Sequence, residues 1–232
     1  MKWLGAVFLG LSFIWLAVPA YSDQLPTVPS PMGFIEGSAL SAVIRDRAMA
    51  GHPASHKLIG QYFLPDALAE ILKNRQTGLT AFCSAYIERE FSSDRAADDY
   101  FKELVKDLKK EGEQKFDRSN PAIDRILRRY EDAAKKSGGG ITVKANGITV
   151  LGAIEETNSY YASALISSYT NSDGQRSAIM TFAIAVAWMR IGPRVLKLYV
   201  TYPFTGKASI GKANDALTGW VHRVAASNSQ RK

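Results

Sequence analysis

The sequence is poor in the residues from which metal centres and disulfides are built. It has one cysteine, Cys83, so no disulfide can form within the chain, and only three histidines among 232 residues. His52 and His56 are four residues apart, but Pro53 lies between them and no third ligand is near in the sequence. Zinc usually takes three or four Cys, His or carboxylate ligands. The sequence therefore predicts no metal site and no cofactor.

Local catalytic motifs are also lacking. No G-x-S-x-G elbow is present, and Cys83 lies in the apolar stretch TAFCSAYIEREF, where a lone thiol is most often a buried hydrophobic residue. In a strand, Glu88 and Glu90 would share a face about 6.6 Å apart with Arg89 pointing away, a separation that acid–base pairs use. The alternative is that Glu88 and Glu90 lie at a solvent-exposed strand end and have no catalytic role. No catalytic residue is assigned, and a hydrolase assembled in space from Glu88, Glu90 or a histidine remains a rival.

Beyond its first 20 residues the chain has no apolar run long enough to span a membrane. Its most apolar stretch there is AIMTFAIAVAWM (178–189), with 12 residues, whereas a spanning helix needs about 20. Gly192 and Pro193 follow, and then VLKLYVTYPF, which is rich in β-branched and aromatic residues. The pattern predicts a β-hairpin whose first strand is buried on both faces.

The first 22 residues have the features of a secretory signal. Lys2 precedes an apolar run, Pro19 follows it, and Ala20 and Ser22 place small residues before a cut at Asp23. We expect a signal peptide over 1–22 and a periplasmic or secreted protein. An uncleaved anchor is the alternative, because the run from Trp3 to Ala20 is almost long enough to span a bilayer.

The rest of the chain predicts one α+β domain. An extended lead-in covers 23–55 with a short helix at 39–49, and the domain covers 56–228. Strands are expected at 57–64, at 79–91, over 141–170 with a turn at Asn146-Gly147, and in the hairpin that follows. Helices are expected at 65–75, at 93–116, from Pro121 to the glycine triplet, and after Pro203. We expect a mostly antiparallel sheet with helices packed on both faces, an α/β/α layered arrangement.

The end of the chain carries a resemblance. RVLKLYVTYPF is followed by a helix that bears Trp220 and closes with Ala225-Ala226-Ser227-Asn228. This pattern resembles a group of uncharacterised exported bacterial proteins, which are similar in layout to the Mog1/PsbP-like fold, over residues 56–228. The resemblance implies a small accessory or binding protein rather than an enzyme, and it transfers no catalytic residue.

Positive charge is concentrated at the C-terminal end. The formal net charge is +7, and residues 171–232 contain nine basic but only two acidic residues. The hairpin and last helix should therefore be basic, which favours anionic lipid headgroups, envelope phosphates or an acidic partner over nucleic acid. The alternative is that these basic residues only keep the protein soluble. A peripheral membrane protein that docks through this part is a third functional hypothesis.

Two candidate binding sites remain. Residues 206–213 fit G-x-x-x-x-G-K, but Ala213 replaces the Ser or Thr that would bind magnesium, and the preceding strand belongs to an antiparallel hairpin. A weaker anion-binding site at this helix start would use Lys207, Ser209 and Lys212, and a plain helix cap is the alternative.

The second candidate is a pocket lined by aromatic strand residues, which would otherwise be core: Tyr160, Tyr161, Tyr169, Trp188 and Tyr199. Since no catalytic set converges in the sequence, the leading hypothesis is an exported, non-catalytic accessory or binding protein of the bacterial cell envelope. An envelope protein or an anionic surface is its expected partner, and the oligomeric state is open.

Overall fold

A computed structural model describes residues 25–50, 52–53, 55–73, 80–111, 115–116, 124, 128, 131–132, 142–172 and 177–229. The predicted signal peptide (1–22) lies outside the described residues. So does most of the helix expected from Pro121, although its four described positions are helical.

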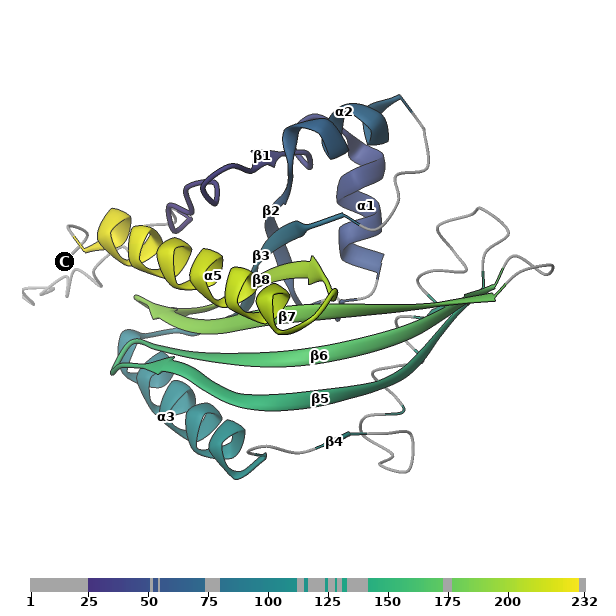
Figure 1. The fold of residues 1–232 in the computed structure, drawn as a ribbon. Coiled ribbons are helices and arrows are strands. Elements are labelled where there is room, and N and C mark those ends of the chain that lie inside the picture. The colour runs from purple at the N-terminus through teal and green to yellow at the C-terminus, as the bar shows by residue number, and fades with distance from the viewer. Residues whose placement is uncertain are drawn as a thin grey trace, which may run out of the picture.

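One antiparallel sheet organises the described chain (Figure 1). Its eight strands follow the order β1-β2-β3-β8-β7-β6-β5-β4, and every neighbouring pair is antiparallel. The strands are β1 (Ile35–Glu36), β2 (Lys57–Phe63), β3 (Phe82–Glu90), β4 (Lys115–Phe116), β5 (Thr142–Glu156), β6 (Tyr160–Ser172), β7 (Ser177–Ile191) and β8 (Arg194–Pro203). The helices are α1 (Ala42–Ala50), α2 (Pro65–Leu72), α3 (Asp94–Glu111) and α5 (Lys207–Asn228). The predicted α+β class is confirmed.

The predicted hairpin forms the centre of the sheet. Strand β7 lies between β6 and β8, and the chain turns at Gly192, whose positive φ of 55° suits glycine. Residues 185–189 of β7 are buried, because both faces of this part are covered. Its first residues are not covered, and Ile179 is 73% exposed. The expected burial on both faces therefore holds for the second half of the strand.

Helix α5 covers one face of the sheet. Alternate β8 residues Leu196, Leu198 and Val200 form a core with the apolar stripe of α5, which includes Leu217 and Trp220. The Trp220 indole Nε1 donates a hydrogen bond to the Pro29 carbonyl oxygen over 2.7 Å. The lead-in is thus tied to α5 and supplies β1 and α1, so residue 55 does not separate it from the rest of the fold.

Helix α3 covers part of the opposite face. Phe101 of α3 is buried against Val186, Trp188 and Val195, which point away from α5. Helix α1 lies over the same face farther along, where the Tyr86 hydroxyl donates to the Ala48 carbonyl oxygen over 3.1 Å. Helices thus lie on both faces of the sheet, as expected.

Strand β5 differs from the sequence prediction. Asn146-Gly147 is not a turn, because residues 142–156 form one strand that stays paired with β6 on both sides of it. The pairing register shifts between Ala145 and Gly147, and again between Val150 and Gly152 and between Ala153 and Glu155. Such bulges bend a strand. They accompany the bend of β5 and β6 that Figure 1 shows.

Three predicted helix boundaries are wrong. Helix α2 ends at Leu72 rather than at residue 75, since Lys73 already has non-helical backbone angles. Helix α1 begins at Ala42 rather than at residue 39, because the Ser41 hydroxyl accepts a hydrogen bond from the Ile44 amide at 3.4 Å and so caps the helix. Helix α3 ends at Glu111 rather than at residue 116, since residues 115–116 pair with β5 as β4.

Candidate functional site: a cavity between the sheet and α3

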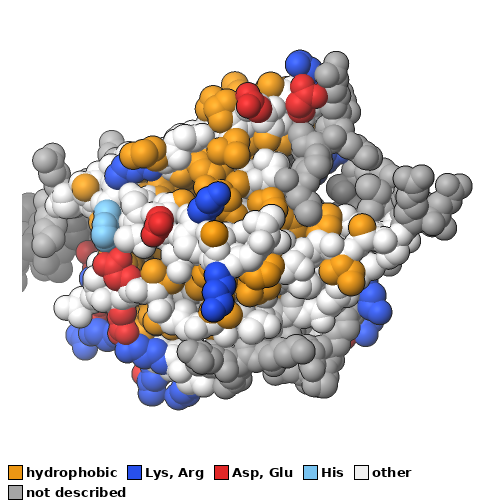
Figure 2. Space-filling view, viewed as in Figure 1, with side chains coloured by type: hydrophobic (Ala, Val, Ile, Leu, Met, Phe, Trp, Pro, Cys, Tyr) orange, Lys and Arg blue, Asp and Glu red, His pale blue; other side chains and the backbone are white. Residues whose placement is uncertain are grey.

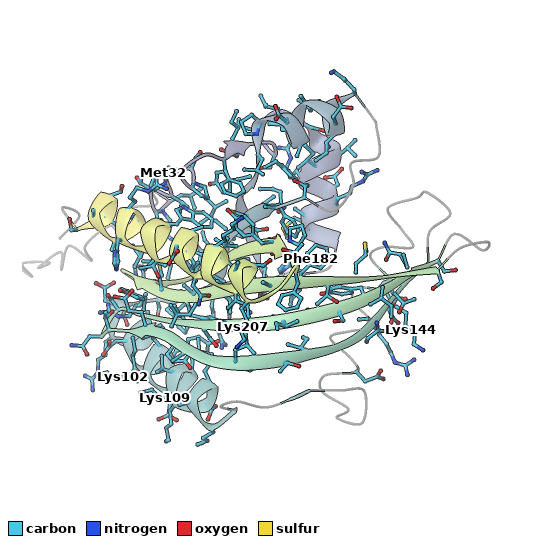
Figure 3. All side chains as sticks on the ribbon, viewed as in Figure 1. Met32, Lys102, Lys109, Lys144, Phe182 and Lys207 are labelled. Carbon is cyan, nitrogen blue, oxygen red and sulfur yellow. The ribbon has the colours of Figure 1, made fainter. Side chains whose placement is uncertain are left out.

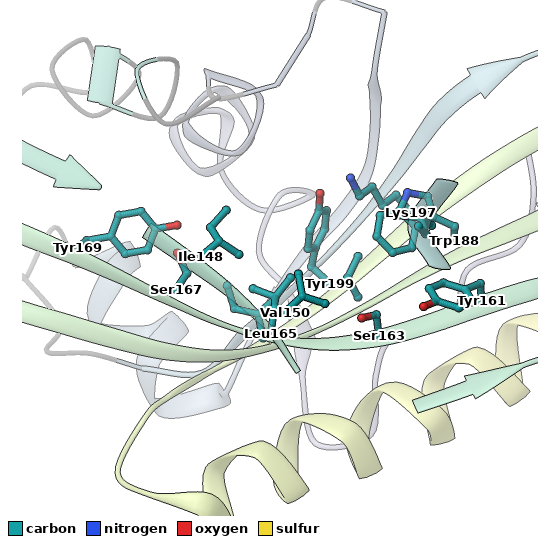
Figure 4. A pocket seen from close by; sticks show the side chains of 13 residues that line it. Ile148, Val150, Tyr161, Ser163, Leu165, Ser167, Tyr169, Trp188, Lys197 and Tyr199 are labelled. Atoms are coloured by element: carbon teal, nitrogen blue, oxygen red, sulfur yellow. The ribbon is translucent and has the colours of Figure 1, made fainter. Parts of the chain in front are cut away.

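A half-open cavity of about 230 Å³ lies on the face of the sheet that carries α3 (Figure 4). Aromatic and aliphatic side chains form most of its wall. The lining residues are Leu108 of α3, Ile148 and Val150 of β5, Tyr161, Ser163, Leu165, Ser167 and Tyr169 of β6, Ile184, Val186 and Trp188 of β7, and Lys197 and Tyr199 of β8.

Strand register brings these side chains to one face. Successive side chains of a strand alternate between faces, so residues at odd positions of β6 share a side. Tyr161 pairs with Trp188, and Trp188 pairs with Lys197 on the next strand. A row of three side chains therefore crosses the sheet beneath α3.

Four of the five aromatic residues predicted to line a pocket do so: Tyr161, Tyr169, Trp188 and Tyr199. Tyr160 does not, because it is adjacent to Tyr161 and so faces the α5 side. There its hydroxyl lies 3.2 Å from His222 Nε2, and His222 lies 3.3 Å from Glu155.

Lys197 is the charged residue of the lining. Its ammonium nitrogen is 4.8 Å from the centre of the Trp188 ring and 5.2 Å from the centre of the Tyr199 ring. Its side chain is 20% exposed, and its nearest ion-pair partner is Glu88 Oε2 at 3.9 Å. Lys197 was not among the residues predicted from the sequence to form a site. The signal that could have found it is a lone cation among apolar and aromatic residues on a central strand.

The predicted pairing of Glu88 with Glu90 is wrong. A bulge between Ile87 and Arg89 shifts the register of β3, so Glu88 and Arg89 both face α3. Tyr100 of α3 donates a hydrogen bond to Glu88 Oε1 at 3.3 Å, and the Arg89 guanidinium lies 5.0 Å from the Tyr100 ring centre. Glu90 points to the other face.

On that face, Glu90 forms ion pairs with Lys57 and Arg194. The Arg194 and Lys57 hydrogen bonds lower the pKa of the Glu90 carboxyl from its usual value. The two carboxylates therefore do not converge on one substrate position as an acid–base pair.

His52 and His56 lie near the Lys197 end of the cavity. Their Nδ1 atoms are 3.3 Å apart, and His52 stacks on Tyr86 with ring centres 3.9 Å apart. Burial, helped by His56 and Lys197, lowers the pKa of His52 to about 4, and burial also lowers that of His56. Within the described ranges, no group of three His, Cys, Asp or Glu residues is placed to hold a metal ion.

Cys83 has the surroundings of a structural residue. Its side chain is fully buried on β3 in the core beneath α5, and burial raises the pKa of its thiol. A nucleophilic cysteine needs the opposite shift, because the thiolate is the reactive form.

The residues predicted to bind an anion do not converge. Ser209 is buried, and its hydroxyl accepts a hydrogen bond from the Thr205 amide at 3.0 Å across the start of α5. Lys207 and Lys212 are both exposed. They are five residues apart, which places them about 140° apart around a helix. The arrangement of Ser209 is that of a local helix-start contact.

Ion pairs involve three of the nine basic residues at the C-terminal end of the chain. Arg190 lies 3.3 Å from Asp98, Arg194 lies 2.8 Å from Glu90, and Lys197 is near Glu88. The basic hairpin is thus matched by acidic residues of β3 and α3. Lysines also gather on α3, where Lys102 and Lys109 project from the helix (Figures 2 and 3). Lys102 and Lys109 form ion pairs with Asp98 and Glu156.

Fold and cavity together define an α+β protein in which helices cover both faces of one antiparallel sheet, with a mainly apolar hollow under one of them. No family model matches the chain, and no curated protein matches it. A solved structure of a mutant of the protein Mog1 is similar over 86% of this chain and 85% of that one, with 12% identity and a TM-score of 0.29. At this identity and TM-score the likeness is weak.

None of the helices in the described part of the chain is long and apolar enough to cross a bilayer.

Proposed function

We propose that this chain is an exported, non-catalytic binding protein of the cell envelope, and that it holds a small, mainly apolar ligand in the cavity between α3 and the sheet. The observation that carries the proposal is the cavity wall, in which aromatic and aliphatic side chains from four strands surround a few polar groups. Ligand sites in proteins typically have this composition. Export rests on the predicted signal peptide.

The size of the cavity limits the ligand. A volume of about 230 Å³ is the share of roughly eight water molecules in the liquid. Since a methylene group takes up about as much room as a water molecule, the cavity suits a chain of about eight carbons or a small ring system. The apolar wall favours burying such a group by about 0.8 kcal/mol for each methylene.

The wall supports binding better than hydrolysis. The Ser163 hydroxyl donates to the Gly152 carbonyl oxygen at 2.9 Å, and the Ser167 hydroxyl donates to that of Gly147 at 3.4 Å. These hydroxyl protons are used in the bulges of β5. An activated serine would instead donate to a neighbouring base. Ion pairing of Arg190 and Arg194 likewise weakens the case for a basic docking face.

A neutral ligand of the size of the cavity tests the proposal. The protein is titrated with 1-octanol in a calorimeter, and we expect saturable binding of one molecule per chain. Leu165→Trp fills the cavity from β6 and should abolish most of the signal. Ile179→Trp is the matched control, because residue 179 is exposed on β7 and outside the cavity. The proposal fails if both variants bind like the wild type.

A further inference from the structure

We propose that the ligand carries a carboxylate and that Lys197 is the residue that recognises it. This inference rests on the proposed function and specifies its substrate class: a small monocarboxylate with an apolar tail of about eight carbons. The tail would lie along the apolar wall, and the carboxylate would meet the ammonium group at the β8 side of the cavity (Figure 4).

The hydrogen-bonding state of Lys197 is the first support. An ammonium group has three donors. Among the residues that the structure describes, none accepts a hydrogen bond from it, and Glu88 Oε2 at 3.9 Å is too far for one. Glu88 Oε2 is itself buried without a hydrogen-bond partner in the described chain. A largely buried ammonium favours a direct acceptor, and a ligand carboxylate would supply it.

The position of Lys197 is the second support. The ammonium lies over the faces of Trp188 and Tyr199, which attract a cation and restrict the long side chain. Lys197 and Tyr199 are two residues apart on β8, so both side chains leave the strand on the cavity side. A cation held in place loses less conformational entropy when the ligand arrives.

Neighbouring polar groups match an acceptor. Burial raises the pKa of the Tyr199 hydroxyl, which therefore stays protonated and able to donate. The Ser163 and Ser167 hydroxyls donate to backbone carbonyls, so their protons are not available to a ligand. The donors that remain in the wall are the Lys197 ammonium and the Tyr199 hydroxyl, and the positive charge of Lys197 favours a carboxylate over an amine. Glu88 lies behind the ammonium and weakens its field, so it limits the affinity for an acid without reversing it.

Three ligands of equal length separate the chemistry. Binding of octanoate, 1-octanol and octylamine is measured by calorimetry at pH 7 with the full chain. We expect octanoate to bind at least about tenfold more tightly than octanol, because hydrogen bonds to charged groups are the stronger kind. Octylammonium should bind most weakly, because it places a second cation beside Lys197.

Variants assign the preference to one residue. Lys197→Met removes the ammonium group and keeps most of the length of the side chain. It should remove the preference for the acid while leaving octanol binding within about twofold. Lys207→Met is the matched control, since Lys207 is exposed on α5, and it should keep the preference. Glu88→Gln keeps the acceptor for Tyr100 but removes the opposing charge, so it should tighten octanoate binding severalfold.

The outcomes are distinguishable. Equal affinities for octanoate and octanol, or a preference for the acid that survives in Lys197→Met, would overturn the assignment of Lys197 while leaving an apolar binding cavity. If Lys197→Met does not fold, unchanged octanoate affinity in Glu88→Gln overturns it instead. Failure of all three ligands to bind the wild type would contradict the proposed function itself.

Discussion

At the scale of single residues, the structure separates side chains that stabilise the fold from those that form the cavity. Leu217 and Trp220 are fully buried between α5 and the sheet. Strand β8, which packs against α5, also carries Lys197 and Tyr199. Their side chains leave β8 on the face of the sheet opposite α5 and line the cavity. Because alternation divides β8 in this way, substitutions on one face should affect stability and those on the other should affect binding.

Truncation of a core residue tests the first half of that division. Leu217→Ala should lower the free energy of unfolding by about 2–5 kcal/mol, because it removes buried methyl groups and leaves a cavity. Ile179→Ala is the control, since this side chain is 73% exposed and the change should stay within about 0.5 kcal/mol. Urea unfolding of both variants gives the comparison. Similar losses would show that α5 is not packed as described.

The half-buried His52 and His56 make stability depend on pH. The pKa of His52 falls from 6.5 in the unfolded chain to about 4 in the fold, and that of His56 is also lowered. Between pH 4 and 6.5 the unfolded chain therefore binds more protons than the folded chain, so their contribution is complete above pH 6.5 and is lost as the pH falls toward 4. Urea unfolding at pH 7 and pH 5 should show this loss.

The double variant His52→Gln/His56→Gln checks the assignment. It removes both titrating groups, so the decrease in stability between pH 7 and pH 5 should be smaller than in the wild type. An equal decrease in the variant would place the pH dependence on other groups, such as the paired carboxylates.

At the scale of elements, β5 was the hardest part to predict. Asn-Gly is a strong hairpin signal between alternating hydrophobic residues, and the sequence contains it at 146–147. The strand nevertheless continues, because β6 pairs along its whole length and the extra residues of β5 form bulges. A local pattern cannot distinguish these two outcomes, since the partner strand decides between them. In the same way, the start of α1 depended on the Ser41 cap, and the end of α3 depended on the pairing of β4 with β5.

Gly152 tests the bulges of β5, and Gly211 of α5 serves as a comparison. Gly152 has a φ of 115°, which L-residues rarely adopt, so Gly152→Ala should destabilise the fold by about 1–3 kcal/mol. Gly211 lies in α5 with nothing near the position of a Cβ atom, so Gly211→Ala should stabilise it by about 0.5–1 kcal/mol. Thermal unfolding measures both. A neutral Gly152→Ala variant would contradict the bulge.

At the scale of the whole molecule, the sequence predicted the architecture better than the site. Hydrophobic patterns identified the hairpin, the strands on either side of α2 and the stripe of α5. Burial of one face of a helix or strand gives its apolar residues a regular spacing in the sequence. Four aromatic residues of the cavity wall were predicted from the aromatic residues of the expected strands. The role of Lys197 and the separation of Glu88 from Glu90 did not, because both depend on neighbouring strands and on the bulge in β3.

Export is a separate prediction at this scale. We expect the mature protein to begin at Asp23 and to occur in the periplasm or the medium, since small residues precede that position after the apolar run. N-terminal sequencing of protein isolated from cell fractions checks the prediction. A chain that keeps Met1 in the membrane fraction would favour the uncleaved anchor.

The central claim is that the cavity beneath α3 is a binding site. A titration of the ¹⁵N-labelled protein with octanoate, followed by amide chemical shifts, tests it most directly. The account predicts saturable shifts at cavity residues such as Leu165, Val186 and Tyr199, with little change at Leu217 and Val221 in the middle of α5. Shifts confined to α5 or to the N-terminal segment, with the cavity residues unmoved, would contradict it.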